Sequence, residues 1–109
     1  MSRAKGDIAE TVTCKFLQES GYVVVERNVY SRFGEIDIVA RKGEMLHFIE
    51  VKSAQDYERA IQNVTPQKIG RILKTVDLFM KKRALNTAYC IDVAIVTPEG
   101  VELLENITF

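Results

Sequence analysis

The sequence contains few of the residues on which zinc and disulfide chemistry depend. Its 109 residues include one histidine, His47, and two cysteines, Cys14 and Cys90, which form no CxxC pair. Because a structural zinc site usually takes four cysteine or histidine ligands, these residues leave such a site incomplete. We therefore expect both cysteines to act as small apolar residues in a reduced, cytoplasmic protein, and His47 to have a structural role.

Further absences exclude other classes of protein. No apolar run approaches the roughly 20 residues that cross a bilayer, and the opening MSRAKGDIAE lacks the apolar part of a secretory signal, so we expect no membrane partner. The P-loop, the G-x-S-x-G elbow and the dinucleotide-binding glycine pattern are also missing. Basic and acidic residues number 15 each, which counts against nucleic-acid binding through overall positive charge. An anionic partner would have to meet a local basic patch.

What the sequence does contain is the composition of one globular domain. Hydrophobic residues make up 47% and charged residues 28% of the chain. This balance supplies enough apolar side chains for a core and is not typical of disorder. Because 109 residues leave room for one such core, we expect residues 1–109 to form a single domain.

The spacing of apolar residues and turn signals predicts the elements. A helix is expected from about residue 4 to residue 20, ended by Gly21, which takes the left-handed conformation at low cost. After a strand over residues 22–28, the segments IDIVA and MLHFIEVK predict a hairpin that turns near Gly43. A second helix begins at Thr65, a good N-cap, with proline in the first turn.

The remaining segments complete the predicted order αβββαββ. Residues 53–64 are expected to form a loop with a short helical turn, and YCIDVAIV and VELLENITF to form the last two strands. The predicted buried faces of the two helices are Ile8, Ala9, Val12, Phe16 and Leu17 in the first, and Ile69, Ile72, Leu73, Val76, Phe79 and Met80 in the second. This order predicts an α/β or α+β domain with a mixed central sheet and a helix on each face.

Charged residues occur in the middle of both hairpin strands. Asp37 lies in the first strand, and Glu50 and Lys52, which share a face because they are two residues apart, lie in the second. If the turn centres near Gly43, Asp37 lies directly or diagonally opposite Glu50, within cross-strand reach. Two carboxylates and an ammonium group would then converge at one end of the hairpin. A solvent-facing Glu–Lys pair beside a surface aspartate would have the same spacing.

Converging carboxylates would favour a divalent cation. Two close carboxylates raise each other's pKa unless a cation intervenes. Carboxylate oxygens, a backbone carbonyl and water are ligands that Mg²⁺ prefers. Such an ion polarises a phosphoryl oxygen and lowers the pKa of a bound water, while Lys52 could orient that water or stabilise developing negative charge.

The sequence also resembles a known group of enzymes. Asp37 followed by Glu50-Val51-Lys52 is similar to the motif of the PD-(D/E)XK nuclease superfamily, and most of the chain resembles the YraN-like family within it. The matching segments are Gly6 with Ala9-Glu10, Gly21-Tyr22, Arg27-Asn28, Gly34 to Asp37, Phe48 to Lys52, and Lys68. The resemblance implies a restriction-endonuclease-like core and an endonuclease, dependent on Mg²⁺ or Mn²⁺, that cuts DNA, including branched or damaged DNA.

The resemblance also implies roles for individual residues. Asp37 and Glu50 would be metal ligands and Lys52 the catalytic lysine, with Glu10 of the first helix as a further acidic ligand. The second helix would contribute an extra polar residue, either Gln67 or Lys68. Glu10 and these two helix residues could equally be ordinary surface residues. Glu35, which precedes the Asp37 strand, is either a site carboxylate or a surface residue.

One position departs from the family pattern. YraN-like sequences commonly carry an arginine two residues after the motif lysine, where this chain has Ala54. The missing cation favours an alternative, a nucleic-acid-binding module that keeps the nuclease fold and does not cut. A third alternative is a protein-interaction domain in which the charged hairpin is structural.

Partners follow from the helix charges and from analogy. Lys68, Arg71 and Lys74 are spaced three apart on one helix and could contact DNA phosphates, although a solvated helix face has the same spacing. By analogy with resolvase-like folds, we also expect a homodimer.

Overall fold

The computed structural model describes the backbone of residues 3–107 and the side chains of residues 7–107. In this part of the chain the elements are α1 (Arg3–Glu19), β1 (Val23–Ser31), β2 (Gly34–Lys42), β3 (Met45–Ser53), α2 (Tyr57–Gln62), α3 (Pro66–Lys82), β4 (Tyr89–Thr97) and β5 (Gly100–Leu104). The predicted elements are present, and α2 is the short helical turn expected within residues 53–64. The last strand is shorter than predicted, and residues 108–109 lie outside the described residues.

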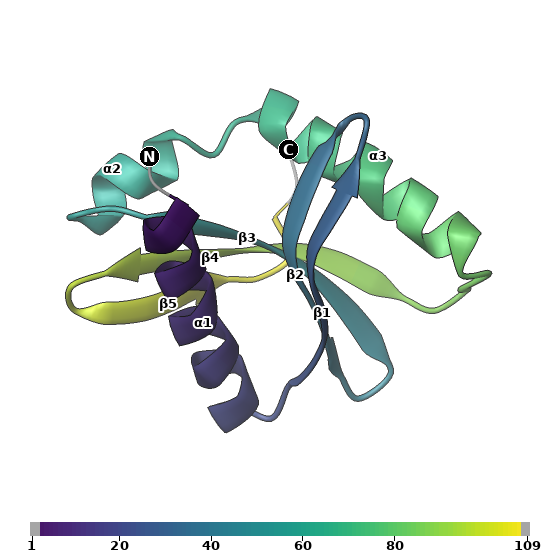
Figure 1. Ribbon diagram of the computed structural model, residues 1–109, viewed down its shortest axis with the longest axis horizontal. Coiled ribbons are helices and arrows are strands. Elements are labelled where there is room, and N and C mark those ends of the chain that lie inside the picture. The colour runs from purple at the N-terminus through teal and green to yellow at the C-terminus, as the bar shows by residue number, and fades with distance from the viewer. Residues whose placement is uncertain (1–2, 108–109) are drawn as a thin grey trace.

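The five strands form one mixed sheet in the order β1-β2-β3-β4-β5. Antiparallel pairing joins β1 to β2, β2 to β3 and β4 to β5, whereas β3 and β4 are parallel. A parallel pair needs a long crossover connection, and α2 and α3 provide it. Figure 1 shows α3 on one side of the sheet and α1 crossing in front of the other.

The helices cover opposite faces of the sheet. Ile38 and Ile49 pack in a cluster with Leu17 of α1, whereas their strand neighbours Val39 and Phe48 pack in a cluster with residues of α3. Because neighbouring residues in a strand point to opposite faces, these two clusters form the two layers of the core. The predicted α+β fold with helices on both faces is therefore confirmed.

The buried face of α1 differs from the predicted face. Ala9 and Leu17 are buried as predicted, but Ile8 is 65% exposed and Val12 is 43% exposed, and Thr13, which was not predicted, lies in the interior. Thr13 can be buried because its hydroxyl donates to the Ala9 carbonyl at 2.8 Å. The helix is therefore rotated so that the row of Ala9, Thr13 and Leu17 faces the sheet, and Ile8 and Val12 face solvent.

The second helix follows the prediction more closely. Thr65 caps α3 by accepting a hydrogen bond from the Lys68 N–H at 3.3 Å, and Pro66 begins the helix. Its predicted apolar face is buried except for Leu73, which is 43% exposed. Thr75, which was not in the predicted face, is buried instead and bonds through its hydroxyl to Ser31 of β1 at 2.7 Å.

Two glycines with positive φ lie in the turn between α1 and β1 and in the turn between β2 and β3. Gly21 has a φ of 91° and ends α1, and the Tyr22 N–H that follows it bonds back to the Leu17 carbonyl at 2.9 Å. Gly43, with a φ of 62°, lies in the turn between β2 and β3. This second turn fixes the register that positions the charged residues of the hairpin.

Candidate active site

The sheet opens between β2 and β3. These strands pair from the Gly43 turn as far as Ile38 and Ile49, where their pairing ends. Beyond that point residues 34–36 of β2 pair with β1, and residues 50–53 of β3 pair with β4. Figure 1 shows β1 and β2 rising away from β3, β4 and β5. The three charged residues predicted to converge lie at this opening.

Asp37 is buried and contacts β3 directly. Its Oδ2 accepts a hydrogen bond from the Val51 N–H at 2.7 Å, just past the end of the β2–β3 ladder. Burial raises the pKa of Asp37 to about 8, together with the hydrogen bond to Glu50 and the negative charge of Glu50. The structure thus brings Asp37 and Glu50 together, and near neutral pH Asp37 keeps a proton next to Glu50.

Lys52 lies beside this carboxyl pair. Its Nζ is 3.9 Å from Oε2 of Glu50, and both side chains are largely sheltered from solvent. The Lys52 ammonium also acts on Asp37, whose pKa it lowers against the larger effects of burial and Glu50. Because Asp37 is buried, the alternative of a surface aspartate beside a solvent-facing pair does not describe this site.

Glu10 reaches the same region from α1. It is only 8% exposed, and its Oε1 lies 3.5 Å from Nη2 of Arg27 on β1. Burial raises the pKa of Glu10, the charge of Asp37 raises it further, and the hydrogen bond to Arg27 lowers it. Glu10 is therefore an interior residue close enough to Asp37 for their charges to interact, and it is not a solvated helix glutamate.

Asn28 links Glu10 to Glu35. With its amide nitrogen turned toward the two carboxylates, it donates to Glu10 Oε1 and to Glu35 Oε2, each at 3.1 Å. Asn28 has a φ of 55° within β1, in the left-handed region that asparagine tolerates better than most residues. Glu35 thus belongs to the edge of the carboxylate cluster, which comprises Glu10, Glu35, Asp37 and Glu50.

The carboxylate cluster has the oxygen donors that a hard divalent cation prefers. Burial, followed by the effects of Glu50, keeps a proton on Asp37 near neutral pH, while Arg27 pairs with Glu10 and Lys52 with Glu50. Within residues 7–107, three possible metal-binding atoms lie within 4.8 Å of one another in His47, Cys90 and Asp92, and not in the carboxylate cluster. A cation at the opening would therefore rest mainly on the Asp37–Glu50 pair and on water, as Mg²⁺ commonly does.

The predicted nucleic-acid-binding residues lie on α3. Gln67 is exposed in its first turn, and Lys68 is half-buried beside the Thr65 cap. Arg71 and Lys74 are exposed farther along the helix. The structure shows no contact that joins Gln67 or Lys68 to the carboxylate cluster within the described residues, so their predicted role stays a prediction.

Arg71 and Lys74 lie next to the turn between β1 and β2. The Nζ of Lys74 is 5.2 Å from the centre of the Phe33 ring, and the Arg32 guanidinium lies 4.8 Å from the same ring. A Cβ at Gly34 would lie 3.8 Å from the Cβ of Arg71, so α3 runs close to the start of β2. Arg32, Arg71 and Lys74 around Phe33 form what we call the basic surface. Arg32 and Phe33 belong to the β1–β2 turn, which the tertiary fold brings next to α3.

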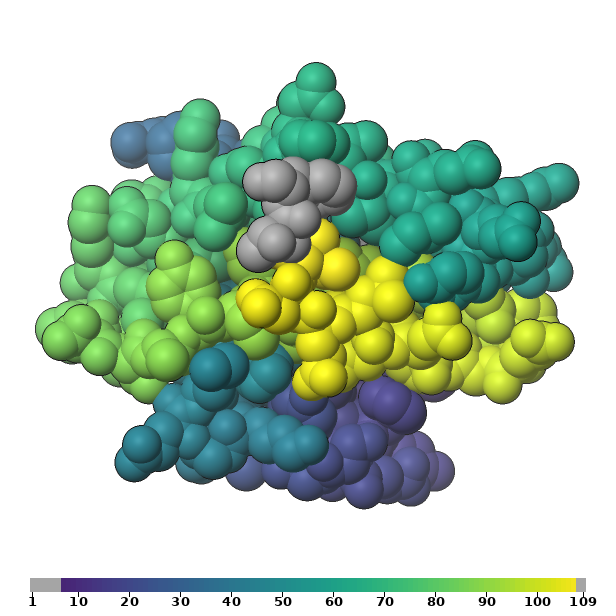
Figure 2. Space-filling model, turned by 180° about the vertical axis from the view of Figure 1, so that it is seen from behind, coloured from purple at the N-terminus to yellow at the C-terminus, as the bar shows by residue number. Residues whose placement is uncertain are grey.

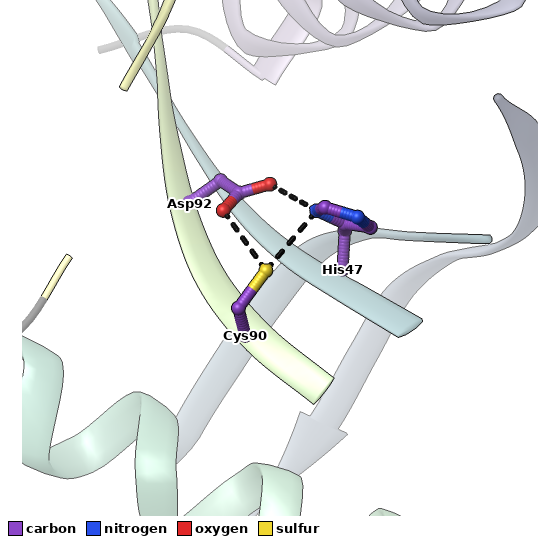
Figure 3. A group of neighbouring side chains, drawn as sticks. All are labelled: His47, Cys90 and Asp92. Atoms are coloured by element: carbon purple, nitrogen blue, oxygen red, sulfur yellow. Dashed lines mark hydrogen bonds and ion pairs between the residues drawn. The ribbon is translucent and has the colours of Figure 1, made fainter. Parts of the chain in front are cut away.

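A second cluster of chemically active side chains lies between β3 and β4 (Figure 3). His47 Nδ1 is 2.6 Å from Asp92 Oδ2 and 3.2 Å from Cys90 Sγ, and Cys90 Sγ is 3.4 Å from Asp92 Oδ1. Cys90 is buried as predicted, but it also makes polar contacts that the prediction did not include. His47 and the cysteines were considered as metal ligands from the sequence, whereas Asp92 was not predicted as a third donor. The C-x-D spacing, which puts both side chains on one strand face, was the available signal.

The fold and the carboxylate cluster define the class of protein, an α+β domain consistent with a restriction-endonuclease-like core. A family model described as uncharacterised protein family UPF0102 matches residues 9–96. Over 99% of both chains, the sequence is 56% identical to a UPF0102 protein of Sulfurimonas denitrificans and 52% identical to one of Aliarcobacter butzleri. A Helicobacter pylori relative is 48% identical over 98% of this chain and 93% of its own. The chain belongs to the UPF0102 family.

None of the helices within residues 3–107 combines the length and the apolar character that a membrane span needs.

Proposed function

We propose that this chain is a metal-dependent endonuclease-like hydrolase of the PD-(D/E)XK superfamily that acts on phosphodiester bonds of DNA. The observation that carries the proposal is the pair of the buried Asp37 and the half-buried Glu50 at the opening of the sheet, with Lys52 beside it. These three side chains have the types and the order of the superfamily motif. The proposal treats residues 1–109 as one nuclease-like domain and branched or damaged DNA as candidate substrates.

The residues of the opening would have two roles in hydrolysis, namely metal binding and stabilisation of the reacting groups. Asp37 and Glu50 would hold Mg²⁺ or Mn²⁺, and Glu10 would become a third acidic ligand once its carboxylate, which pairs with Arg27, moves toward them. When bound, the ion supplies a Lewis acid for a phosphoryl oxygen and lowers the pKa of a water. Lys52, with its ammonium 3.9 Å from Glu50, would orient the attacking water or stabilise negative charge that develops on the phosphate.

The protonation of Asp37 supports a cation at this place. Asp37 keeps a proton near neutral pH because burial disfavours its charged form, and because Glu50 lies beside it as a hydrogen-bond partner and a negative charge. A divalent cation reverses this balance, because binding favours the ionised carboxylate and displaces its proton. Perturbed carboxyl pairs of this kind are concentrated at functional sites.

The basic surface supports DNA as the partner. Net charge is zero, so phosphate contacts must come from a local group. Arg32, Arg71 and Lys74 supply three cations next to the start of β2, the strand that carries Asp37. Phe33 adds an aromatic ring on which a base could stack. Free thiols at Cys14 and Cys90 fit a reducing cytoplasm, and we propose that location.

Cleavage of supercoiled plasmid and of a four-way DNA junction, in Mg²⁺ and in Mn²⁺, tests the proposal. We expect ion-dependent cleavage by the wild type and a loss of at least about 100-fold in Asp37→Ala and Lys52→Ala. Lys15→Ala, at an exposed position of α1, should cut like the wild type. Cleavage that persists undiminished in the Asp37 and Lys52 variants would exclude the proposed mechanism.

A second candidate is a nucleic-acid-binding module that does not cut, and Ala54 favours it. Ala54 directly follows β3, packs against the α3 side of the core and donates its N–H to the Val96 carbonyl at 3.0 Å. No cation therefore extends from the position where YraN-like sequences commonly have arginine. A mobility-shift titration that shows binding without cleavage in either metal would support this candidate. A protein-interaction domain would bind neither DNA nor metal.

A homodimer also stays a proposal, made by analogy. Two copies would double the short DNA footprint that a chain of 109 residues offers. Sedimentation at working concentration distinguishes the dimer from a monomer.

A further inference from the structure

The cluster of His47, Cys90 and Asp92 is separate from the carboxylate cluster in position and in chemistry. Its donor atoms all lie within 4.8 Å of one another. His47 precedes Glu50 by three residues, which corresponds to about 10 Å along a strand. Thiol, imidazole and carboxylate meet here, whereas the opening of the sheet offers carboxylates and an ammonium group.

The pairing of β3 and β4 builds this cluster. In the parallel register His47 lies beside Cys90, and Asp92 follows two residues later on the same face. All three side chains are at most 9% exposed, and Asp92 is fully buried. Three donors from two central strands are thus held in a part of the fold that has little freedom to move.

Residues outside the two strands complete the surroundings. The Tyr22 ring contacts the His47 ring edge-on at 5.0 Å, and the Asn106 N–H donates to Asp92 Oδ1 at 2.9 Å. Tyr22 in turn donates its hydroxyl to Glu105 at 2.9 Å. The segment after β5 therefore lies over the cluster, and Figure 2 shows this end of the chain, in yellow, between α3 and the purple N-terminal residues.

We propose that His47 Nδ1, Cys90 Sγ and the Asp92 carboxylate bind one divalent transition-metal ion of the zinc type. Thiolate and imidazole are ligands that zinc prefers and magnesium does not, and a carboxylate is the usual third type. With a neutral imidazole, one thiolate and one carboxylate balance the two positive charges of the ion. Three protein ligands leave a fourth position for water.

The distances between the donor atoms are close to those of a tetrahedral site. With metal bonds of about 2.0 Å to nitrogen or oxygen and about 2.3 Å to sulfur, neighbouring ligand atoms lie roughly 3.3–3.6 Å apart. The two contacts of Cys90 Sγ, at 3.2 and 3.4 Å, are already near this range. The 2.6 Å contact of His47 is to Oδ2 of Asp92, whereas the 3.4 Å contact of Cys90 is to Oδ1, so the carboxylate has to turn until one oxygen faces both partners.

The same residues do not suit a cysteine nucleophile. Burial, followed by the charge of Asp92 and its hydrogen bond, raises the pKa of Cys90 to about 12, so the metal-free thiol keeps its proton. Cys90 and Asp92 also contact the same ring nitrogen, Nδ1, so His47 cannot relay a proton from one to the other. Metal binding replaces the thiol proton, which passes to solvent, and affinity therefore rises with pH.

A pocket on the α3 side of the sheet borders Cys90, but the side chains of the cluster point to the α1 side, so this pocket does not open onto the donors. It has a volume of about 500 Å³, and its lining includes Leu73 of α3, Tyr89, Cys90, Asn106 and Ile107. Cys90 is 9% and His47 is 7% exposed, so an ion has to reach the cluster through local opening of the fold.

Titration of the chelator-treated full chain with Co²⁺ tests the site, because a cobalt–thiolate bond gives a charge-transfer absorption band in the near ultraviolet. We expect this band to saturate at one ion per chain, with release of at least one proton, and to disappear in Cys90→Ser. The matched control is Cys14→Ser, which removes the other buried thiol and should keep the band. Asp37→Asn should also keep it, since the carboxylate cluster is a separate site.

Two outcomes would overturn the proposal. One is a wild-type protein without the charge-transfer band, and the other is a band that survives in a folded Cys90→Ser variant. If that variant does not fold, X-ray absorption at the zinc edge of the wild type decides, since the site predicts one sulfur ligand and a spectrum with only nitrogen and oxygen ligands excludes it. Either failure would leave the proposed nuclease function untouched, because that function rests on other residues.

Discussion

At the scale of single residues, the unusual feature is a carboxyl group kept in the interior next to a second one. Asp37 has one backbone donor, the Val51 N–H, and otherwise faces burial and the charge of Glu50. A group whose folded-state pKa is raised makes the fold less stable once solvent would ionise it. Groups of this kind are concentrated at functional sites, where the reaction requires a residue that lowers the stability of the fold.

Asp37→Asn should stabilise the protein and abolish its activity. The contribution of Asp37 to the wild-type free energy of unfolding falls as pH rises from about 4 to about 8, because over this window its folded form keeps a proton that the unfolded chain has released. The asparagine amide can still accept from Val51 and can donate to Glu50, without the charge. We expect a gain of about 1–3 kcal/mol near pH 8 and less near pH 5, measured by urea unfolding.

Asp77→Asn is the control for this measurement. Asp77 is exposed on α3 and pairs with Lys81 at 3.0 Å, so its loss should change stability by less than about 0.5 kcal/mol at either pH. An Asp37→Asn protein that is less stable than the wild type at both pH values would contradict the account of this buried pair.

The sequence was most informative where the relevant contacts are local. Asp37, Glu50 and Lys52 could be predicted to converge because one turn at Gly43 fixes the hairpin register. Asp92 could not be added to His47 and Cys90, because their meeting depends on the parallel pairing of β3 with β4. That pairing joins strands separated by two helices, and local sequence patterns do not specify it.

At the scale of elements, the helix α1 shows why apolar spacing alone can fail. Leu17 of the predicted face is buried, but Ile8 and Val12 are exposed and Thr13 is buried in their place. The Thr13 hydroxyl donates a hydrogen bond to the backbone. Glu10 pairs with Arg27 and accepts a hydrogen bond from Asn28, so both polar side chains are satisfied in the interior. A sequence pattern does not reveal such partners. The rotation is what brings Glu10 to the carboxylate cluster.

Alanine substitutions on the two rows of α1 should therefore differ strongly in cost. Leu17→Ala removes a fully buried side chain and should lower the free energy of unfolding by about 2–5 kcal/mol. Val12→Ala, on the exposed row, should change it by less than about 0.5 kcal/mol. Denaturant unfolding measures both. Equal costs, or a larger cost at Val12, would show that the helix is not oriented as described.

At the scale of the whole molecule, a chain with no net charge has to bind an anion through a patch. The basic surface of Arg32, Arg71 and Lys74 lies beside the strand that carries Asp37, so a bound phosphate backbone could reach the opening of the sheet. The predicted helix spacing identified Arg71 and Lys74. Their neighbour Arg32 comes from the β1–β2 turn and joins them only through the fold.

Charge reversal on α3 should weaken DNA binding, because each substituted cation no longer neutralises a phosphate. For Arg71→Glu with Lys74→Glu we expect at least about a 10-fold loss of affinity and a shallower salt dependence, by roughly 0.9 for each phosphate that is no longer neutralised. Mobility-shift titrations at several salt concentrations measure both quantities. Lys82→Glu, at the far end of the same helix, is the matched control. A double variant that binds like this control would remove the basic surface from the account.

We propose that the opening between β2 and β3 holds a divalent cation on Asp37 and Glu50. Anomalous X-ray diffraction from crystals of this chain soaked in Mn²⁺ would locate that ion. We expect an anomalous peak within bonding distance of oxygen atoms of both carboxylates, and no such peak in Asp37→Asn. A peak confined to His47, Cys90 and Asp92, or a Mn²⁺ structure without an ion between Asp37 and Glu50, would contradict it.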